Sequence, residues 1–121
     1  MTSTSWNSAS WNVVVLRGIL SSEPIERTLR SGTNVLQWDV TTKANGVTRV
    51  VPVQWDDPPR PILDYDEDDE VVLVGEVRRR FFRAGGATMS RTEVLAHHAA
   101  RPRQKVAVRR MLDRSLTQLT S

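Results

Sequence analysis

Cysteine is absent from this 121-residue chain, so it has neither a disulfide framework nor a thiolate metal site. No apolar run approaches the roughly 18 residues that a membrane-spanning helix needs. The first ten residues, MTSTSWNSAS, lack the basic start and the apolar stretch of a secretory signal peptide. These absences favour a cytoplasmic protein without a membrane partner, and the length favours one domain with a single core.

Patterns typical of catalysis or metal binding are equally scarce. His97 and His98 are adjacent on an expected strand and face opposite ways, with no cysteine or third histidine to accompany them. The acidic run DYDEDDE lacks the glycine and the terminal glutamate of a calcium loop, so we interpret it as a solvated turn. Ser, His and Asp occur without a nucleophile elbow or other catalytic context. We therefore expect a non-enzymatic protein without a metal or another cofactor.

The charge is unevenly distributed along the chain. The formal net charge is +3 at pH 7, yet residues 64–70 carry six acids and no base. Residues 71–121 carry 11 basic and 3 acidic side chains. Such a positive half indicates a polyanionic partner, although a basic solvated surface is the alternative. Charge alone favours nucleic acid only slightly.

Period-two alternation of apolar residues predicts a mostly β chain. Strands are expected over residues 11–20, 25–42 (as a hairpin), 47–55, 70–83 and 88–99. Asn45-Gly46 and Gly85-Gly86 are typical turn signals, and Pro52 places its part of a strand at an edge or bulge. Residues 61–68 have room for one helical turn at most. An all-β chain of five strands with this insertion matches the Greek-key barrel of the oligonucleotide-binding (OB) fold.

The end of the chain has a helical period instead. Apolar residues recur at helical spacing from Val108 to Leu119 and predict an amphipathic helix over residues 104–119. The expected organisation is a flexible N-terminal arm (1–10), an OB domain (11–103) and a C-terminal amphipathic helix or tail (104–121). The apolar stripe needs a cover. Its own barrel, a neighbouring subunit and a separate partner are the alternatives, and we expect the neighbouring subunit.

The stretch EVRRRFFR, residues 76–83, places cations and rings on an expected strand. Alternation along the strand puts Arg78, Arg80 and Phe82 on one exposed face, and Val77 and Phe81 on the face toward the core. Single-stranded nucleic acid requires this combination, because cations contact phosphates and rings stack on unpaired bases. The alternative is a solvated basic hairpin with two core phenylalanines.

Four blocks of the sequence resemble, in order and spacing, the bacterial single-stranded DNA-binding proteins: NVVVLRGILSSEPIERTLRSG, GVTRVVPV, DDEVVLVGEVRRRFF and SRTEVLAHHAARP. The resemblance covers about residues 12–103. The many arginines and the Pro102 after the last expected strand resemble the actinobacterial branch of this family. It implies an OB fold, a homo-oligomer (a tetramer favoured, a dimer possible) and sequence-tolerant single-stranded DNA binding in replication, repair or recombination, in the nucleoid. Family members carry an acidic C-terminal tip that recruits repair enzymes. The present sequence ends RSLTQLTS, so no recruitment by that route is expected.

The resemblance also implies site residues. Phe82 stands at a base-stacking position of the family and Arg49 at the arginine of its W-x-R-V-V block. Val47 and Val53 stand where the family has rings, so Trp55, on the same strand face, is the expected substitute. The complete set of expected DNA-binding residues is Arg49, Arg78, Arg80, Phe82, Trp55, Arg83, Arg27, Arg30, Lys43 and Arg91.

The other tryptophans have different expected roles. Trp38 aligns with a core position, Trp11 is expected to pack on the barrel, and the role of Trp6 in the arm is open.

Two alternative functions also stay open. One is an accessory OB protein of replication restart or plasmid transfer that acts mainly through a protein partner. The other is an RNA-binding OB module, since rings on a strand do not distinguish ribose from deoxyribose.

Overall fold

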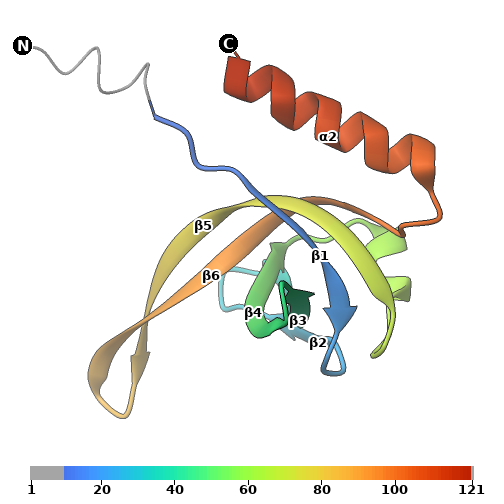
Figure 1. Cartoon of the computed structure of the whole chain (residues 1–121). Coiled ribbons are helices and arrows are strands. Elements are labelled where there is room, and N and C mark those ends of the chain that lie inside the picture. Colours follow the sequence, from blue (N-terminus) through green and yellow to red (C-terminus); the bar gives the residue numbers. More distant parts are fainter. Residues whose placement is uncertain (1–9, 121) are drawn as a thin grey trace, which may run out of the picture.

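The computed structural model describes residues 10–120 (Figure 1). Trp6 and nearly all of the arm expected at residues 1–10 lie outside this range. The elements in chain order are β1 (Val14–Leu20), β2 (Ile25–Thr28), β3 (Asn34–Ala44), β4 (Val47–Asp56), the 3₁₀ helix η1 (Arg60–Asp64), β5 (Glu70–Ala84), β6 (Ala87–Ala100) and the helix α2 (Lys105–Thr120). Within the same range, no helix is long and apolar enough to cross a membrane.

Five of the strands close into a barrel. Going round the ring, β1 pairs antiparallel with β5, β5 antiparallel with β6, β6 parallel with β4, and β4 antiparallel with β3. The ring closes where Ile19 and Leu20 of β1 pair with β3. β2 forms the expected hairpin with β3 and is the edge strand of the sheet next to it. This arrangement confirms the predicted all-β, five-stranded OB-fold barrel with a C-terminal helix.

Two glycines allow the strands to approach closely enough for closure. A Cβ atom at Gly18 would collide with the carbonyl oxygen of Thr41, at the point where β1 passes from β5 to β3. A Cβ atom at Gly75 would collide with the carbonyl oxygen of Leu95, beside the register shift in the β5–β6 pairing. The absence of a side chain at these two positions is therefore a condition for closing the ring.

The barrel interior is centred on aromatic rings. Trp38 and Trp55 are each 2% exposed, and their ring centroids lie 5.9 Å apart in an edge-to-face arrangement. Tyr65, just after η1, lies 5.1 Å from the Trp38 ring. Trp38 is therefore a core residue, as predicted. The prediction that Trp55 stacks on bases is wrong, because the face of β4 that carries Val53 and Trp55 points into the barrel.

The helix α2 packs on the barrel of its own chain. Met111, which is buried, contacts a cluster formed by Val72 and Val74 of β5 and Ala100 of β6, and Val108 packs against the same cluster. Figure 1 shows the helix lying over the outer side of these two strands. Its own barrel thus covers the Val108 and Met111 part of the stripe, whereas Leu112 and Leu116 stay 37% and 60% exposed. The expected cover by a neighbouring subunit stays a prediction.

Truncation of the buried methionine should measure how strongly α2 is docked. Met111→Ala should lower the free energy of unfolding by about 2–5 kcal/mol, because it removes buried methylene groups and leaves a cavity. Leu116→Ala on the same helix is the matched control. Its side chain is 60% exposed, so the change should stay within about 0.5 kcal/mol. Urea unfolding measures both, and equal losses would contradict docking through Met111.

Candidate nucleic-acid interface

β5 and β6 continue past the barrel as a two-stranded ribbon, defined here as residues 78–93. The pairing of β5 with β1 ends at Gly75, and the pairing of β6 with β4 begins at Val94. Between these limits and the Gly85-Gly86 turn, the two strands pair only with each other among residues 10–120. Figure 1 shows the ribbon projecting from the barrel to the lower left. Every residue from Phe81 to Thr92 is exposed.

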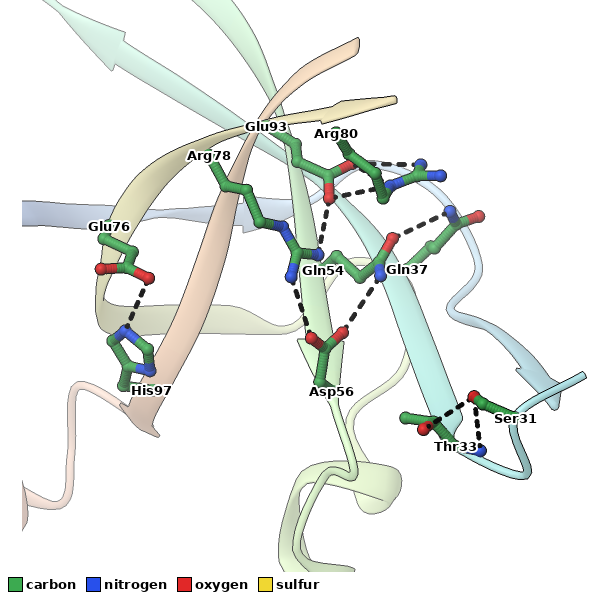
Figure 2. A network of polar contacts seen from close by, with 10 residues as sticks. All are labelled: Ser31, Thr33, Gln37, Gln54, Asp56, Glu76, Arg78, Arg80, Glu93 and His97. Carbon is green, nitrogen blue, oxygen red and sulfur yellow. Dashed lines mark hydrogen bonds and ion pairs between the residues drawn. The ribbon is translucent and has the colours of Figure 1, made fainter. Parts of the chain in front are cut away.

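An ionic cluster of four residues lies at the base of the ribbon (Figure 2). Arg78 donates from Nη1 to Oδ2 of Asp56 and from Nη2 to Oε2 of Glu93, both at 2.9 Å. Arg80 donates from Nε to the same Glu93 oxygen at 3.2 Å. The Glu93 side chain is 2% exposed, whereas those of Arg78 and Arg80 are 25% and 30% exposed. The expectation that Arg78 and Arg80 are free, exposed cations is therefore wrong, because two carboxylates neutralise them.

Amide side chains extend this cluster across the outer side of the barrel. Gln54 of β4 donates to Asp56 at 3.1 Å, and Gln37 of β3 donates to Gln54 at 3.4 Å. Arg27 of β2 in turn donates to Gln37. The ribbon is tied in this way to three neighbouring strands. A two-stranded ribbon is marginally stable by itself, so we attribute its order to this attachment.

The cluster shifts the pKa values of its members toward the charged forms. Burial by itself would raise the pKa of Glu93, but hydrogen bonds from Arg80 and Arg78 hold the pKa below its ordinary value. Burial also opposes ionisation of Asp56, and again the hydrogen bond from Arg78 leads to a lowered pKa. The pKa of Arg78 is raised, because its bonds to the two carboxylates outweigh the effect of burial.

Acid should therefore weaken the folded state through Asp56 and Glu93. Because their pKa values are lower in the folded chain, the unfolded chain binds protons first as the pH falls. The stabilisation is complete above the ordinary carboxyl pKa of about 4–4.5 and is lost as the pH falls through the folded values. In Asp56→Asn/Glu93→Gln, the urea midpoint should depend less on pH below about pH 5 than in the unaltered protein. An equal dependence would contradict this origin of acid sensitivity.

Each face of the ribbon presents a phenylalanine beside an arginine. The guanidinium carbon of Arg79 lies 5.5 Å from the centroid of Phe81, and that of Arg80 lies 5.2 Å from the centroid of Phe82. Phe81 is 66% exposed and Phe82 is 37% exposed. The prediction that Val77 and Phe81 face the core is wrong, because Val77 is 47% exposed and the barrel does not extend beneath this side of β5. Arg79 and Phe81 are thus candidate site residues that the sequence interpretation missed.

The other predicted cations are exposed but lie in different places. Arg83 and Arg91 are on the ribbon, where Arg83 donates to the carbonyl of Gly86 at 3.0 Å and Arg91 is opposite Arg80. Three cations lie elsewhere: Lys43 on β3, Arg49 on β4 and Arg30 in the turn between β2 and β3. The structure therefore brings together the predicted residues of β5 and β6 but not the complete predicted set.

A second candidate surface is an open groove of about 610 Å³ between β1 and the β3–β4 hairpin. Lys43 and Arg17 line it together with Asp68 and Glu70. Arg17 lies 3.9 Å from Glu70, in a pair with both side chains exposed. Because the groove is lined by two acidic residues as well as two basic ones, it fits a polyanion less well than the ribbon does.

Asn12 is a further residue that the sequence interpretation missed. Its side-chain amide donates to the carbonyl of Val77 and accepts from the Val77 N–H, both at 2.8 Å. Asn12 pairs with the edge of β5 just before the start of β1, as a strand residue would. The neighbouring Trp11 is 64% exposed, so the prediction that it packs on the barrel is wrong.

The two histidines show no arrangement for metal binding. His97 lies 3.8 Å from Glu76, and the pKa of His98 is lowered by burial and by the nearby Arg114 and His97. Among the described residues, no group of three or more His, Cys, Asp or Glu side chains is placed to hold a metal ion.

Comparison of the sequence with protein-family models and with curated proteins found no match. The strand pairing establishes the OB fold, and the resemblance to single-stranded DNA-binding proteins stays a prediction.

Proposed function

We propose that this chain binds single-stranded DNA with little sequence preference, and that the β5–β6 ribbon is its main contact surface. The observation that carries the proposal is the pair of exposed rings, Phe81 and Phe82, each beside an arginine on a ribbon that projects from an OB barrel. Stacking on an exposed ring contributes about 1–3 kcal/mol per base and tolerates any base, because every base has a flat face.

The charge of the ribbon supports a nucleic acid over a second copy of the chain as its partner. Its charged side chains are five arginines and one acid: Arg78, Arg79, Arg80, Arg83, Arg91 and Glu93. Pairing two such ribbons edge to edge would bring like charges together, which opposes association. A polyanion instead gains from the cations that the ionic cluster leaves free, and its bases cover the rings.

The sequence resemblance supports two further parts of the proposal. These are a homotetramer or dimer, and a role in cytoplasmic DNA replication, repair or recombination.

One observation favours a second candidate function, in which a protein partner is the main ligand. Leu112 and Leu116 on α2 are 37% and 60% exposed even though the helix is docked. Exposed apolar residues that lie close together on one helix are a common feature of interaction sites.

Titration of labelled oligo-dT, an RNA of the same length and duplex DNA at several salt concentrations tests the proposal. We expect oligo-dT to bind more tightly than the duplex. If four to six phosphates are contacted, log affinity should fall with log salt at a slope of about −3 to −4, at −0.7 per contact. Equal or tighter binding of RNA would favour the RNA-binding alternative. A flat salt dependence would contradict phosphate contacts and favour the protein-partner candidate.

A further inference from the structure

Arg78 and Arg80 lie on the proposed contact surface, yet their guanidinium groups are already occupied. Arg78 divides its two terminal nitrogens between Asp56 and Glu93. Its Nε is buried, with no hydrogen-bond partner among residues 10–120. Arg80 donates to Glu93 from Nε at 3.2 Å and from Nη2 at 3.2 Å. Figure 2 shows both arginines converging on the one carboxylate.

The Glu93 carboxylate accepts hydrogen bonds from these arginines in the way that a phosphate would. Arginine binds carboxylate and phosphate with the same fork of N–H donors. The Oε2 atom of Glu93 accepts from both arginines, and Oε1 accepts from Arg80. A phosphate that took over the two arginines would leave Glu93 as a buried carboxylate without partners, and such a state is strongly unfavourable. A buried carboxylate such as Glu93 therefore competes with a phosphate for the two arginines more strongly than an exposed carboxylate would.

The same contact fixes the orientation of Arg80. Its guanidinium carbon lies 5.2 Å from the centre of the Phe82 ring while its nitrogens bind Glu93. Glu93 thus holds the arginine against the ring. Arg79, on the other face, has no carboxylate partner among the described residues and donates to the hydroxyl of Ser90.

We propose that Glu93 determines how many phosphates the ribbon contacts, because it withholds Arg78 and Arg80 from the nucleic acid and positions Arg80 beside Phe82. This inference rests on the proposed function. The phosphate contacts of the ribbon then come from Arg79, Arg83 and Arg91. Glu93 is a positioning residue that acts through the two arginines.

The salt dependence of oligo-dT binding tests this assignment, since its slope counts phosphate contacts and a purely structural role would not change it. Glu93→Gln should release Arg80, whereas Arg78 keeps its bond to Asp56. The slope should therefore steepen by about 0.7, and by up to about 1.4 if Arg78 also exchanges Asp56 for a phosphate, at 0.7 per added contact. Glu76→Gln is the matched control. The Glu76 carboxylate lies on the same face of β5 as the two arginines but contacts His97 and not the arginines. Its removal should therefore leave the slope unchanged. The triple variant Arg78→Gln/Arg80→Gln/Glu93→Gln leaves no unpaired carboxylate at position 93, and it should keep the unaltered slope, because it removes the two arginines that Glu93 withholds.

Two results would overturn the inference. One is a slope about 1.4 shallower in the triple variant, since both arginines would then already contact phosphates in the unaltered protein. The other is an unchanged slope in a folded Glu93→Gln protein. Failure of the unaltered protein to bind oligo-dT would be a different result, because it removes the proposed function itself.

A measurement on the unaltered protein keeps the inference testable if Glu93→Gln does not fold. The side-chain Nε–H signal of Arg78, followed by NMR, should keep its position when oligo-dT is added, while that of Arg83 should shift. A shift of the Arg78 signal as large as that of Arg83 would overturn the inference. Asp56→Asn supplies a milder variant, because the Asp56 side chain is 40% exposed. It should steepen the slope by no more than about 0.7.

Discussion

Alanine at Phe81 or at Phe82 should each weaken the binding of oligo-dT by about 1–3 kcal/mol, which corresponds to roughly 5- to 150-fold in affinity. Each ring is exposed on its own face of the ribbon, so each can stack on a base. The double variant should lose more than either single variant, about 2–6 kcal/mol if the two stacking contacts are independent. Fluorescence anisotropy with labelled oligo-dT at constant salt measures these losses.

The stability of the same variants separates stacking from folding. Because neither ring belongs to the core, the urea midpoint should change little in all three proteins. Leu63→Ala is the control, since it truncates another exposed apolar side chain, 41% exposed, on η1 outside the ribbon. Unchanged oligo-dT affinity in the double phenylalanine variant would contradict the ribbon as the contact surface. If only one of the two single variants loses affinity for oligo-dT, the DNA follows only the face of the ribbon that carries that ring.

The fold was predictable because its determinants are local. Alternating apolar residues located the strands, and the Gly85-Gly86 turn, with φ values of 57° and 80°, located the longest hairpin. The ring closure at Gly18 and the parallel pairing of β4 with β6 were not visible in the sequence. They entered the prediction because five strands with one insertion match few architectures.

The faces of strands were harder to predict than the strands themselves. Alternation shows which residues share a face, but it does not show what lies beneath that face. Phe81 shares its side of β5 with Leu73, which is completely buried, yet the barrel has ended by residue 81 and the ring is exposed. Trp55 shares its side of β4 with Arg49. Here the barrel encloses Trp55, whereas Arg49 lies on the part of β4 that is exposed.

The neutralisation of the arginines was only partly accessible from the sequence. Counting back along both strands from the Gly85-Gly86 turn places Arg78 opposite Glu93, as the observed register confirms. That signal was present, and it predicts a cross-strand ion pair. The contribution of Asp56 depends on the pairing of β4 with β6, which joins strands far apart in the sequence. The docking of α2 on β5 and β6 could not be predicted either, because the helical period of apolar residues does not identify the surface against which a helix packs.

Replacement of Trp55 should have the largest effect on stability. Trp55→Ala should lower the free energy of unfolding by about 3–5 kcal/mol, because it leaves a cavity beside Trp38 in the centre of the barrel. A loss of this size is a large part of the roughly 5–15 kcal/mol that stabilises a typical domain. Thermal and urea unfolding, followed by far-UV circular dichroism, measure the change.

Trp55→Phe separates the core role of this residue from the base-stacking role that the sequence predicted. The indole Nε1 of Trp55 is buried, with no hydrogen-bond partner among the described residues. An unpaired buried donor costs about 1–3 kcal/mol, so its removal should offset part of the lost ring volume, and the variant should lose less than half as much stability as Trp55→Ala. Its affinity for oligo-dT should equal that of the unaltered protein, because the ring at this position is 2% exposed. A folded Trp55→Phe protein with weakened oligo-dT binding would instead mean that the barrel opens around this ring when DNA binds.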